Sequence, residues 1–254
     1  MLDRLLACPE TKRLDLDNPE VTAIRREVIR NRPFLRKIYE EWYGLIAERV
    51  PPLPGAIVEL GSGPGFLREY VPDLITSDVS TVEGIDQVID GRQLPFADSS
   101  LRAIVMTDAL HHIPRVERFF SEAQRTLRRG GRIVAIEPWY TPWSGLIYRT
   151  FHHEPFITDA TEWAFPESGP LSGANGALPW IVTVRDRSRF EALYPSLRIT
   201  EIVPFMPFRY LVSGGVSRRS LQPGWMHRAW AALENRKGLA ERAAMFAVIT
   251  IDRT

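Results

Sequence analysis

With 254 residues, of which 44% are hydrophobic and 25% charged, the chain has the composition of a globular protein with one large domain or two small ones. Its formal net charge of +1 lacks the basic excess of a general nucleic-acid binder, so no such binding is expected. The single cysteine, Cys8, excludes an intrachain disulfide and a thiolate metal cluster, which fits a cytoplasmic location.

The first fifty residues are predicted to form an irregular arm and helices. A charged helix is expected over residues 19–30. Apolar residues then recur at helical spacing over residues 34–46, and Pro33 stands in the first turn, where proline is tolerated. A group of prolines ends this helix. We therefore divide the chain into an N-terminal arm and helix, residues 1–50, and a main domain, residues 51–254.

Short apolar runs then alternate with helical patterns. Strands are predicted at residues 56–60, 74–77, 87–89, 103–107 and 133–136. An amphipathic helix is expected over residues 115–128, ended by Gly130 and Gly131. This alternation favours a parallel sheet of βαβ units. The roughly ten residues between the second and third strands are too few for a full crossover, so a loop is expected there.

Aromatic residues crowd the segment 138–185, together with proline, glycine and histidine. Loops at the carboxyl edge of an α/β sheet confer specificity, so this insertion is the expected substrate lid. Many of its aromatics fit a small secondary core equally well. After it we expect helices at residues 186–193 and 225–233 and strands at residues 197–203 and 245–251.

A glycine loop follows the first predicted strand. The run AIVELGSGPGFL leads directly into Gly61, Gly63 and Gly65, and glycine allows positive φ and close approach of a ligand to the backbone. A helical segment is expected after this loop. The dinucleotide loop G-x-G-x-x-G would place its third glycine where this chain has Phe66. The spacing E-x-G-x-G-x-G, which starts at Glu59, instead resembles motif I of class I methyltransferases.

Further segments extend this resemblance. Asp78 in ITSDVS and Asp90 in VIDGRQLPFADSS stand at the acidic positions of that family, and TDALHHI and RTLRRGGRIVAIEP match its later segments. The similarity covers residues 56–138 and is to the group that includes ubiquinone- and sterol-modifying enzymes. It implies an α/β fold of the doubly wound, Rossmann-like type. The sheet would have seven mostly parallel strands with helices on both faces, and the segment 138–185 would be an inserted lid.

The resemblance also implies S-adenosyl-L-methionine as the cofactor. The glycine loop would wrap its amino-acid end, Asp78 would accept hydrogen bonds from both ribose hydroxyls, and Asp90 would lie on the adenine side. The expected cofactor-binding residues are Glu59, Gly61, Ser62, Gly63, Gly65, Phe66, Asp78, Val79, Asp90, Gly91, Thr107 and Asp108.

Three residues are candidates for catalysis: His111, His112 and Glu137. Much of the rate of methyl transfer can come from alignment, but an alcohol acceptor benefits from a base, and histidine titrates at about pH 6.5. Each candidate has a structural alternative, since a histidine can pack against the cofactor or fix the loop, and Glu137 can pair with an arginine. In the aromatic segment, His152, His153 and Glu154 could reach over the pocket, but no matching ligand set is visible, so no metal is expected.

The acceptor is expected to be a small molecule in the class of glycans or lipid-linked precursors, with methylation on oxygen favoured over carbon or nitrogen. The segment 209–228 mixes arginine with tryptophan and tyrosine, which suits a phosphate-bearing or interfacial ligand and also an ordinary solvated helix. No run of residues approaches the length of a membrane span, so membrane contact would be peripheral. The alternatives are a non-catalytic S-adenosylmethionine-binding subunit that supports a partner enzyme and, disfavoured by Phe66, an NAD(P)-dependent oxidoreductase. The oligomeric state is open.

Overall fold

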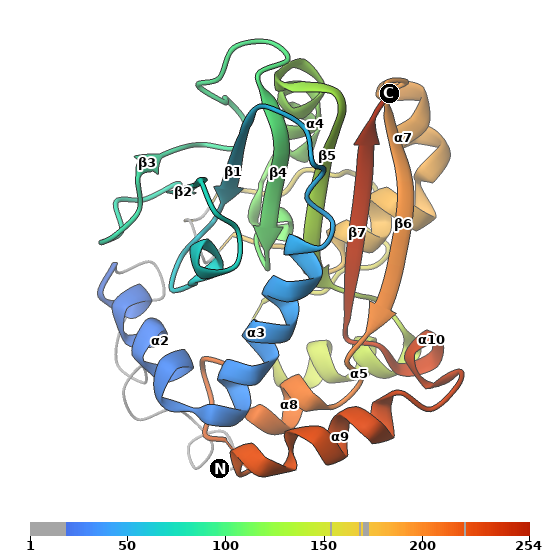
Figure 1. Ribbon diagram of the computed structural model, residues 1–254. Helices are drawn as coiled ribbons and strands as arrows, with labels where there is room; N and C mark the ends of the chain where they lie inside the picture. Colours follow the sequence, from blue (N-terminus) through green and yellow to red (C-terminus); the bar gives the residue numbers. More distant parts are fainter. Residues whose placement is uncertain (1–18, 153, 168, 170–172, 221) are drawn as a thin grey trace.

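A seven-stranded sheet organises the computed structural model, which describes residues 19–152, 154–167, 169, 173–220 and 222–254 (Figure 1). The strand order is β3-β2-β1-β4-β5-β7-β6. The strands are β1 Ala56–Leu60, β2 Leu74–Asp78, β3 Gln87–Val88, β4 Leu101–Thr107, β5 Leu127–Pro138, β6 Leu197–Phe205 and β7 Phe246–Arg253. The arm predicted at the N-terminus falls on residues 1–18 and lies outside the described residues.

The sheet is parallel except at one strand. β1 pairs in parallel with β2 and β4, β2 with β3, and β4 with β5, whereas β7 runs antiparallel to both β5 and β6. Parallel strands covered on both faces are apolar throughout, and β4 is buried at every position except Arg102 and Thr107. The predicted mostly parallel, doubly wound sheet is therefore confirmed.

Helices cover both faces of this sheet. The α-helices of the described residues are α2 Pro19–Asn31, α3 Pro33–Ala47, α4 Val116–Thr126, α5 Pro142–Phe151, α6 Leu178–Trp180, α7 Arg187–Leu193, α8 Arg209–Ser213, α9 His227–Glu234 and α10 Leu239–Ala243. Of these, α5, α8, α9 and α10 lie beyond the carboxyl ends of the parallel strands (Figure 1). α3 crosses one face, and α4 and α7 lie together on the other (Figure 1), where the Phe120 and Phe190 rings are 5.0 Å apart. No helix in the described part of the chain is long and apolar enough to cross a membrane.

Helix α3 belongs to the same hydrophobic core as the sheet. Its buried face includes Phe34, Ile38 and Trp42, and the Trp42 ring lies 4.8 Å from Phe246 on β7. A domain boundary at residue 50 stays a prediction.

Two local expectations are wrong, each for a physical reason. The glycine loop leads only into a single 3-10 turn, Leu67–Glu69, because Pro72 follows and proline disfavours helix in the residue before it. Helix α4 ends at Thr126, and Gly130 and Gly131 lie inside β5 rather than capping the helix. There they form an irregularity between two stretches of pairing with β4, and Gly130 has a φ of +76°. The loop predicted between β2 and β3 is confirmed.

Candidate functional site

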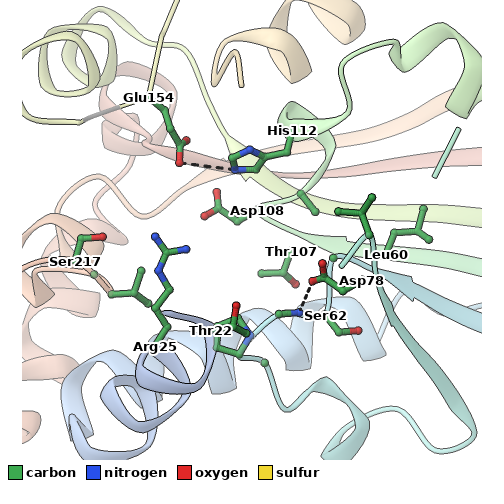
Figure 2. Close-up of a pocket in the computed structure, with 18 of the residues that line it drawn as sticks. Thr22, Arg25, Leu60, Ser62, Asp78, Thr107, Asp108, His112, Glu154 and Ser217 are labelled. Atoms are coloured by element: carbon green, nitrogen blue, oxygen red, sulfur yellow. Dashed lines mark hydrogen bonds and ion pairs between the residues drawn. The ribbon is translucent and has the colours of Figure 1, made fainter. Parts of the chain in front are cut away.

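A cavity of about 750 Å³ opens at the carboxyl ends of β1, β2 and β4 (Figure 2). One wall consists of the segments that follow these strands: residues 59–65, 78–80 and 107–109. We call it the cofactor wall. The opposite side, which we call the acceptor wall, is lined by residues of α2 and α5, by Glu154, and by residues 210–218. A crevice at the carboxyl edge of the strands is where ligands bind in open α/β sheets.

The glycine loop presents backbone where a side chain would not fit. Gly61 has a φ of +70°, and a Cβ there would lie 2.7 Å from the Cβ of Ala109. A Cβ on Gly65 would lie 2.6 Å from the hydroxyl oxygen of Tyr43. The Ser62 amide donates to the carbonyl of Ser77 over 2.8 Å, which ties the loop to β2. The loop is thus a rigid cradle of exposed backbone.

Asp78 stands at the end of β2, facing this loop. Its Oδ2 accepts a hydrogen bond of 3.2 Å from the Gly63 amide, and its Oδ1 accepts one of 3.2 Å from the Ser80 amide (Figure 2). Burial raises the pKa of Asp78, and these backbone donors oppose the rise. The carboxylate is therefore positioned by the backbone on both sides and still lines the cavity.

Glu59 is almost fully buried beneath the loop. Its Oε2 accepts a hydrogen bond of 2.6 Å from the Ser62 hydroxyl. Burial raises the pKa of Glu59 to about 7, and the Ser62 hydrogen bond opposes this shift. Near neutral pH the carboxyl group is consequently protonated in part of the molecules and ionised in the rest.

Asp90 is held by an arginine of its own loop. Arg92 donates to both carboxylate oxygens, over 3.0 Å from Nε and 2.8 Å from a terminal nitrogen, and also to Glu167 over 2.5 Å. Burial would raise the pKa of Asp90, but the hydrogen bonds and charge of Arg92 outweigh it and lower the pKa. Asp90 is thus a fixed anion at one end of the cavity.

The cavity brings together eleven of the twelve expected cofactor residues. Phe66 is not among the lining residues. Its ring packs edge-on against Tyr43 with 4.8 Å between ring centres, and its amide donates to the Tyr43 hydroxyl. Phe66 therefore supports the loop from behind.

His111 and Glu137 lie behind the cavity wall. Both side chains are at most 1% exposed, and His111 Nδ1 is 2.7 Å from Glu137 Oε2. Glu137 Oε1 accepts hydrogen bonds from the amides of Ala109 and Leu110, so it also fixes the turn after β4. Burial would lower the pKa of His111, but its hydrogen bonds to Glu137 and Glu154 raise it well above the usual value.

His112 faces the cavity instead. Its Nδ1 is 3.0 Å from the carbonyl oxygen of Gly173, and because a carbonyl can only accept, Nδ1 carries the proton. Burial lowers the pKa of His112 to about 4, and the charge of His111 lowers it further. His112 is therefore neutral at neutral pH, with Nε2 directed toward Glu154, 3.7 Å from its Oε1 (Figure 2).

Asp108 projects into the cavity from a strained backbone position. Its φ is +58°, and its amide donates to the carbonyl of Ile136 over 2.8 Å. Figure 2 shows its carboxylate on the side of the cavity where His112 and Glu154 lie. Burial raises the pKa of Asp108 to about 7, while the charge of His111 lowers it. Such strain at a cavity wall is typical of functional positions.

Helix α2 contributes cavity residues that were not predicted from the sequence, whereas Glu154, which was expected to reach over the pocket, does line the cavity. Thr22 and Arg25 of α2 line the cavity, and the Arg25 guanidinium points into it (Figure 2). Arg25 Nε is buried without a hydrogen-bond partner among the described residues. In the sequence α2 shows only a charged helical pattern, which contains no signal for the face that meets the cavity.

Comparison with known proteins agrees with this geometry. Residues 58–135 match the family model of a methyltransferase domain. The ubiquinone/menaquinone biosynthesis C-methyltransferase UbiE of Rhizobium etli is 35% identical over 48 residues, 19% of this chain and 19% of that protein. The matched stretch thus spans about a fifth of the length of this curated relative.

Two solved structures share the fold. The geranyl diphosphate C-methyltransferase from Streptomyces coelicolor A3(2) superposes with a TM-score of 0.55 at 16% identity, covering 91% of this chain and 83% of that one. A geranyl diphosphate methyltransferase in complex with GPP and sinefungin gives a TM-score of 0.52 at 16% identity, covering 85% and 78%. At this identity the similarity establishes the fold alone.

Proposed function

Because the chain carries a class I S-adenosylmethionine-dependent methyltransferase domain, we propose that it transfers a methyl group from S-adenosylmethionine to an oxygen of a small-molecule acceptor. The observation that carries this proposal is the continuous cavity, in which the cofactor wall faces an acceptor wall of different chemistry. When bound, the cofactor supplies a methyl group already activated by its sulfonium.

The residues of the cofactor wall fit this group. The backbone at Gly61 and Gly65 would receive its amino-acid end, where a Cβ would clash. Asp78, fixed by two backbone amides, would accept hydrogen bonds from the ribose hydroxyls. Asp90 and Gly91 would line the adenine side.

The acceptor wall combines an apolar strip with polar and cationic groups. Ile147 and the half-exposed ring of Phe151 provide apolar contact, and Arg25 and Arg218 provide positive charge. An acceptor with an apolar part and an anionic part, such as a lipid-linked precursor, suits this combination, as does a glycan that stacks on the ring.

Proton removal from a hydroxyl acceptor would fall to groups that line the cavity. The Asp108 carboxylate and the neutral His112 both lie there and could accept a proton or position the hydroxyl. We assign His111 and Glu137 a positioning role, because their hydrogen bonds hold the turn that presents Asp108 and His112.

The test is a binding titration followed by an acceptor screen. We expect S-adenosylmethionine and S-adenosylhomocysteine to bind and NADH not to bind, and we expect Asp78→Ala to weaken binding of both by about tenfold or more. Asp98→Ala, which removes a carboxylate that is paired with Arg125 and does not line the cavity, is the matched control and should leave binding unchanged.

Methyl-labelled cofactor would then be offered with sugar and lipid-linked acceptors, and the labelled position read by NMR. Label on an oxygen supports the proposal. Label on carbon or nitrogen would overturn the proposal that oxygen is methylated. Binding of NADH, without binding of S-adenosylmethionine and S-adenosylhomocysteine, would overturn the proposed methyl transfer itself.

A further inference from the structure

Three side chains at the junction of the turn after β4 and the lid converge like metal ligands. The donor atoms of His111, His112 and Glu154 all lie within 4.8 Å of one another. His111 Nε2 is 3.3 Å from Glu154 Oε2, and His112 Nε2 is 3.7 Å from Glu154 Oε1. Metal–ligand bonds of about 2.0–2.2 Å around a four-coordinate ion place neighbouring donors roughly 3.3–3.5 Å apart, so small side-chain movements would complete such a shell.

The second ring nitrogen of each histidine is already engaged as in known metal sites. His111 Nδ1 meets the Glu137 carboxylate at 2.7 Å, and His112 Nδ1 donates to the Gly173 carbonyl at 3.0 Å. A histidine that binds a metal through one nitrogen almost always donates from the other to a carboxylate or a carbonyl. Both Nε2 atoms are thereby directed at the same carboxylate.

Charge around the three residues favours a cation. The carboxylates of Glu137 and Glu154 contact the two ring nitrogens of His111, and the carboxylate of Asp108 lies close enough to act on its charge. Glu137 is fully buried and Glu154 is 14% exposed, so water screens this negative charge poorly. A divalent ion would neutralise it.

We propose that His111, His112 and Glu154 form a binding site for a divalent transition-metal ion, with Zn²⁺ as the ion that suits these ligands best. Imidazole nitrogens favour Zn²⁺ over Mg²⁺ or Ca²⁺, which prefer oxygen. His112 and Glu154 line the cavity, so a remaining coordination position would open toward the acceptor. If the proposed O-methylation holds, the ion would bind and polarise the acceptor oxygen there, and Asp108 rather than the metal-bound His112 would accept its proton.

The competing account is an ion-pair cluster without metal. A protonated His111 between Glu137 and Glu154 would satisfy the same distances. The two accounts differ in what an added ion does: a metal site takes up one Zn²⁺ per chain through these ligands, whereas an ion-pair cluster takes up none.

The experiment uses untagged full-length protein that has been stripped with a chelator, without cofactor or acceptor. Zn²⁺ is titrated by calorimetry, and Co²⁺ is followed by its visible absorption. We expect one ion per chain and a Co²⁺ spectrum of nitrogen and oxygen ligation. Absence of saturable uptake would show an ion-pair cluster only and overturn the proposal.

Variants locate the ion. Glu154→Gln and His112→Gln are each expected to weaken Zn²⁺ binding by at least about tenfold. Glu167→Gln is the matched control, since Glu167 also lines the cavity but pairs with Arg92 and lies outside the cluster. Unchanged affinity in both ligand variants would contradict the assignment.

Thermal melting and S-adenosylmethionine titration of each variant check that it is folded. Because the metal titration needs neither cofactor nor acceptor, its failure leaves the proposed methyl transfer standing. Failure of cofactor binding would likewise leave the metal result intact.

Discussion

The two walls of the cavity are built in different ways. The cofactor wall consists of three short segments at strand ends, held by backbone hydrogen bonds such as those from the Ser62 amide to Ser77 and from the Asp108 amide to Ile136. The acceptor wall is assembled from α2, the lid and residues 210–218, and side chains hold these parts together. A wall formed by backbone requires glycines at fixed spacings, which can be recognised in the sequence. A wall held together by side-chain contacts between distant segments can be recognised only by the amino-acid composition of those segments.

Arg209 illustrates the second kind of construction. It lies in the arginine-rich segment, yet it is 4% exposed and pairs with Glu234 and Glu41. Glu234 Oε1 also accepts hydrogen bonds of 2.7 Å from the amides of Phe208 and Arg209. This network joins α8 to α3 and α9, so Arg209 supports the acceptor wall from behind.

Replacing Arg209 tests that role and should give the largest effect on stability. Arg209→Ala leaves Glu234 buried without its partner, so we expect the free energy of unfolding to fall by about 3–5 kcal/mol. Urea denaturation measures it, with the exposed Arg228→Ala as a control that should stay within about 0.5 kcal/mol. A stable Arg209→Ala protein that no longer binds phosphate-bearing acceptors would instead make Arg209 a ligand residue.

The next largest effect is expected at Glu59 in the cofactor wall, whose contribution to the free energy of unfolding depends on pH. The pKa of Glu59 is about 7 in the folded chain against an ordinary 4.5, so folding favours the protonated form. The stabilisation that protonated Glu59 gives the folded chain is fully present below about pH 4.5 and is lost as pH rises through about 7. The free energy of unfolding therefore falls by about 3 kcal/mol over this range. Glu59→Gln should therefore be more stable than the natural protein at pH 8 by about this amount.

Chemical denaturation of both proteins from pH 4 to pH 8 checks the sign. Asp78 and Asp108 titrate in both proteins and cancel in the difference. Curves that stay parallel across this range would show that Glu59 is not the source of the pH dependence.

A smaller loss is expected where the backbone itself makes the cofactor wall. Gly61→Ala forces a Cβ to 2.7 Å from Ala109 at a φ of +70°, which should cost about 2 kcal/mol and weaken cofactor binding about tenfold or more. In Gly44→Ala, within α3, the new Cβ meets nothing within 4 Å, so stability should rise by up to about 1 kcal/mol. Equal effects of the two changes would show that the cofactor wall does not depend on the missing Cβ at Gly61.

The smallest effect should appear on the acceptor wall alone. Phe151 lines the cavity and is 45% exposed, so Phe151→Ala should raise the KM for the acceptor about tenfold and leave cofactor affinity unchanged. Leu146 lies on the same helix, is 60% exposed and does not line the cavity, so Leu146→Ala is the control. A change in cofactor affinity in Phe151→Ala would show that the two walls are coupled.

What the sequence predicted follows the same division. The strands that hold the cofactor wall were located to within a few residues, because buried parallel strands are uninterrupted apolar runs. Eleven of the twelve residues expected to bind the cofactor line the cavity, since their spacing is set by strand ends. The helix after the glycine loop was predicted from a general pattern that Pro72 interrupts.

Residues whose position depends on long-range packing could not be found in this way. Arg25 reaches the cavity only because α2 packs against α3 and against the loop between β2 and β3. Arg26 of α2 donates to the Glu83 carbonyl of that loop over 2.9 Å. Glu154 meets His111 across 43 positions of the chain, a proximity that no local pattern encodes. The lid aromatics likewise divide between the cavity edge, where Phe151 lies, and a buried cluster that includes Trp163.

The place of β7 in the sheet constrains how the chain can be assembled during synthesis. Among the strands of the described residues, β6 lies at an edge of the sheet and pairs with β7 alone, and β7 separates it from β5. A growing chain therefore presents β6 with no strand to pair with, and leaves one edge of β5 open, until β7 has left the ribosome. An open edge of this kind invites pairing with other chains, so the nascent protein is most exposed to aggregation in the interval between these two strands.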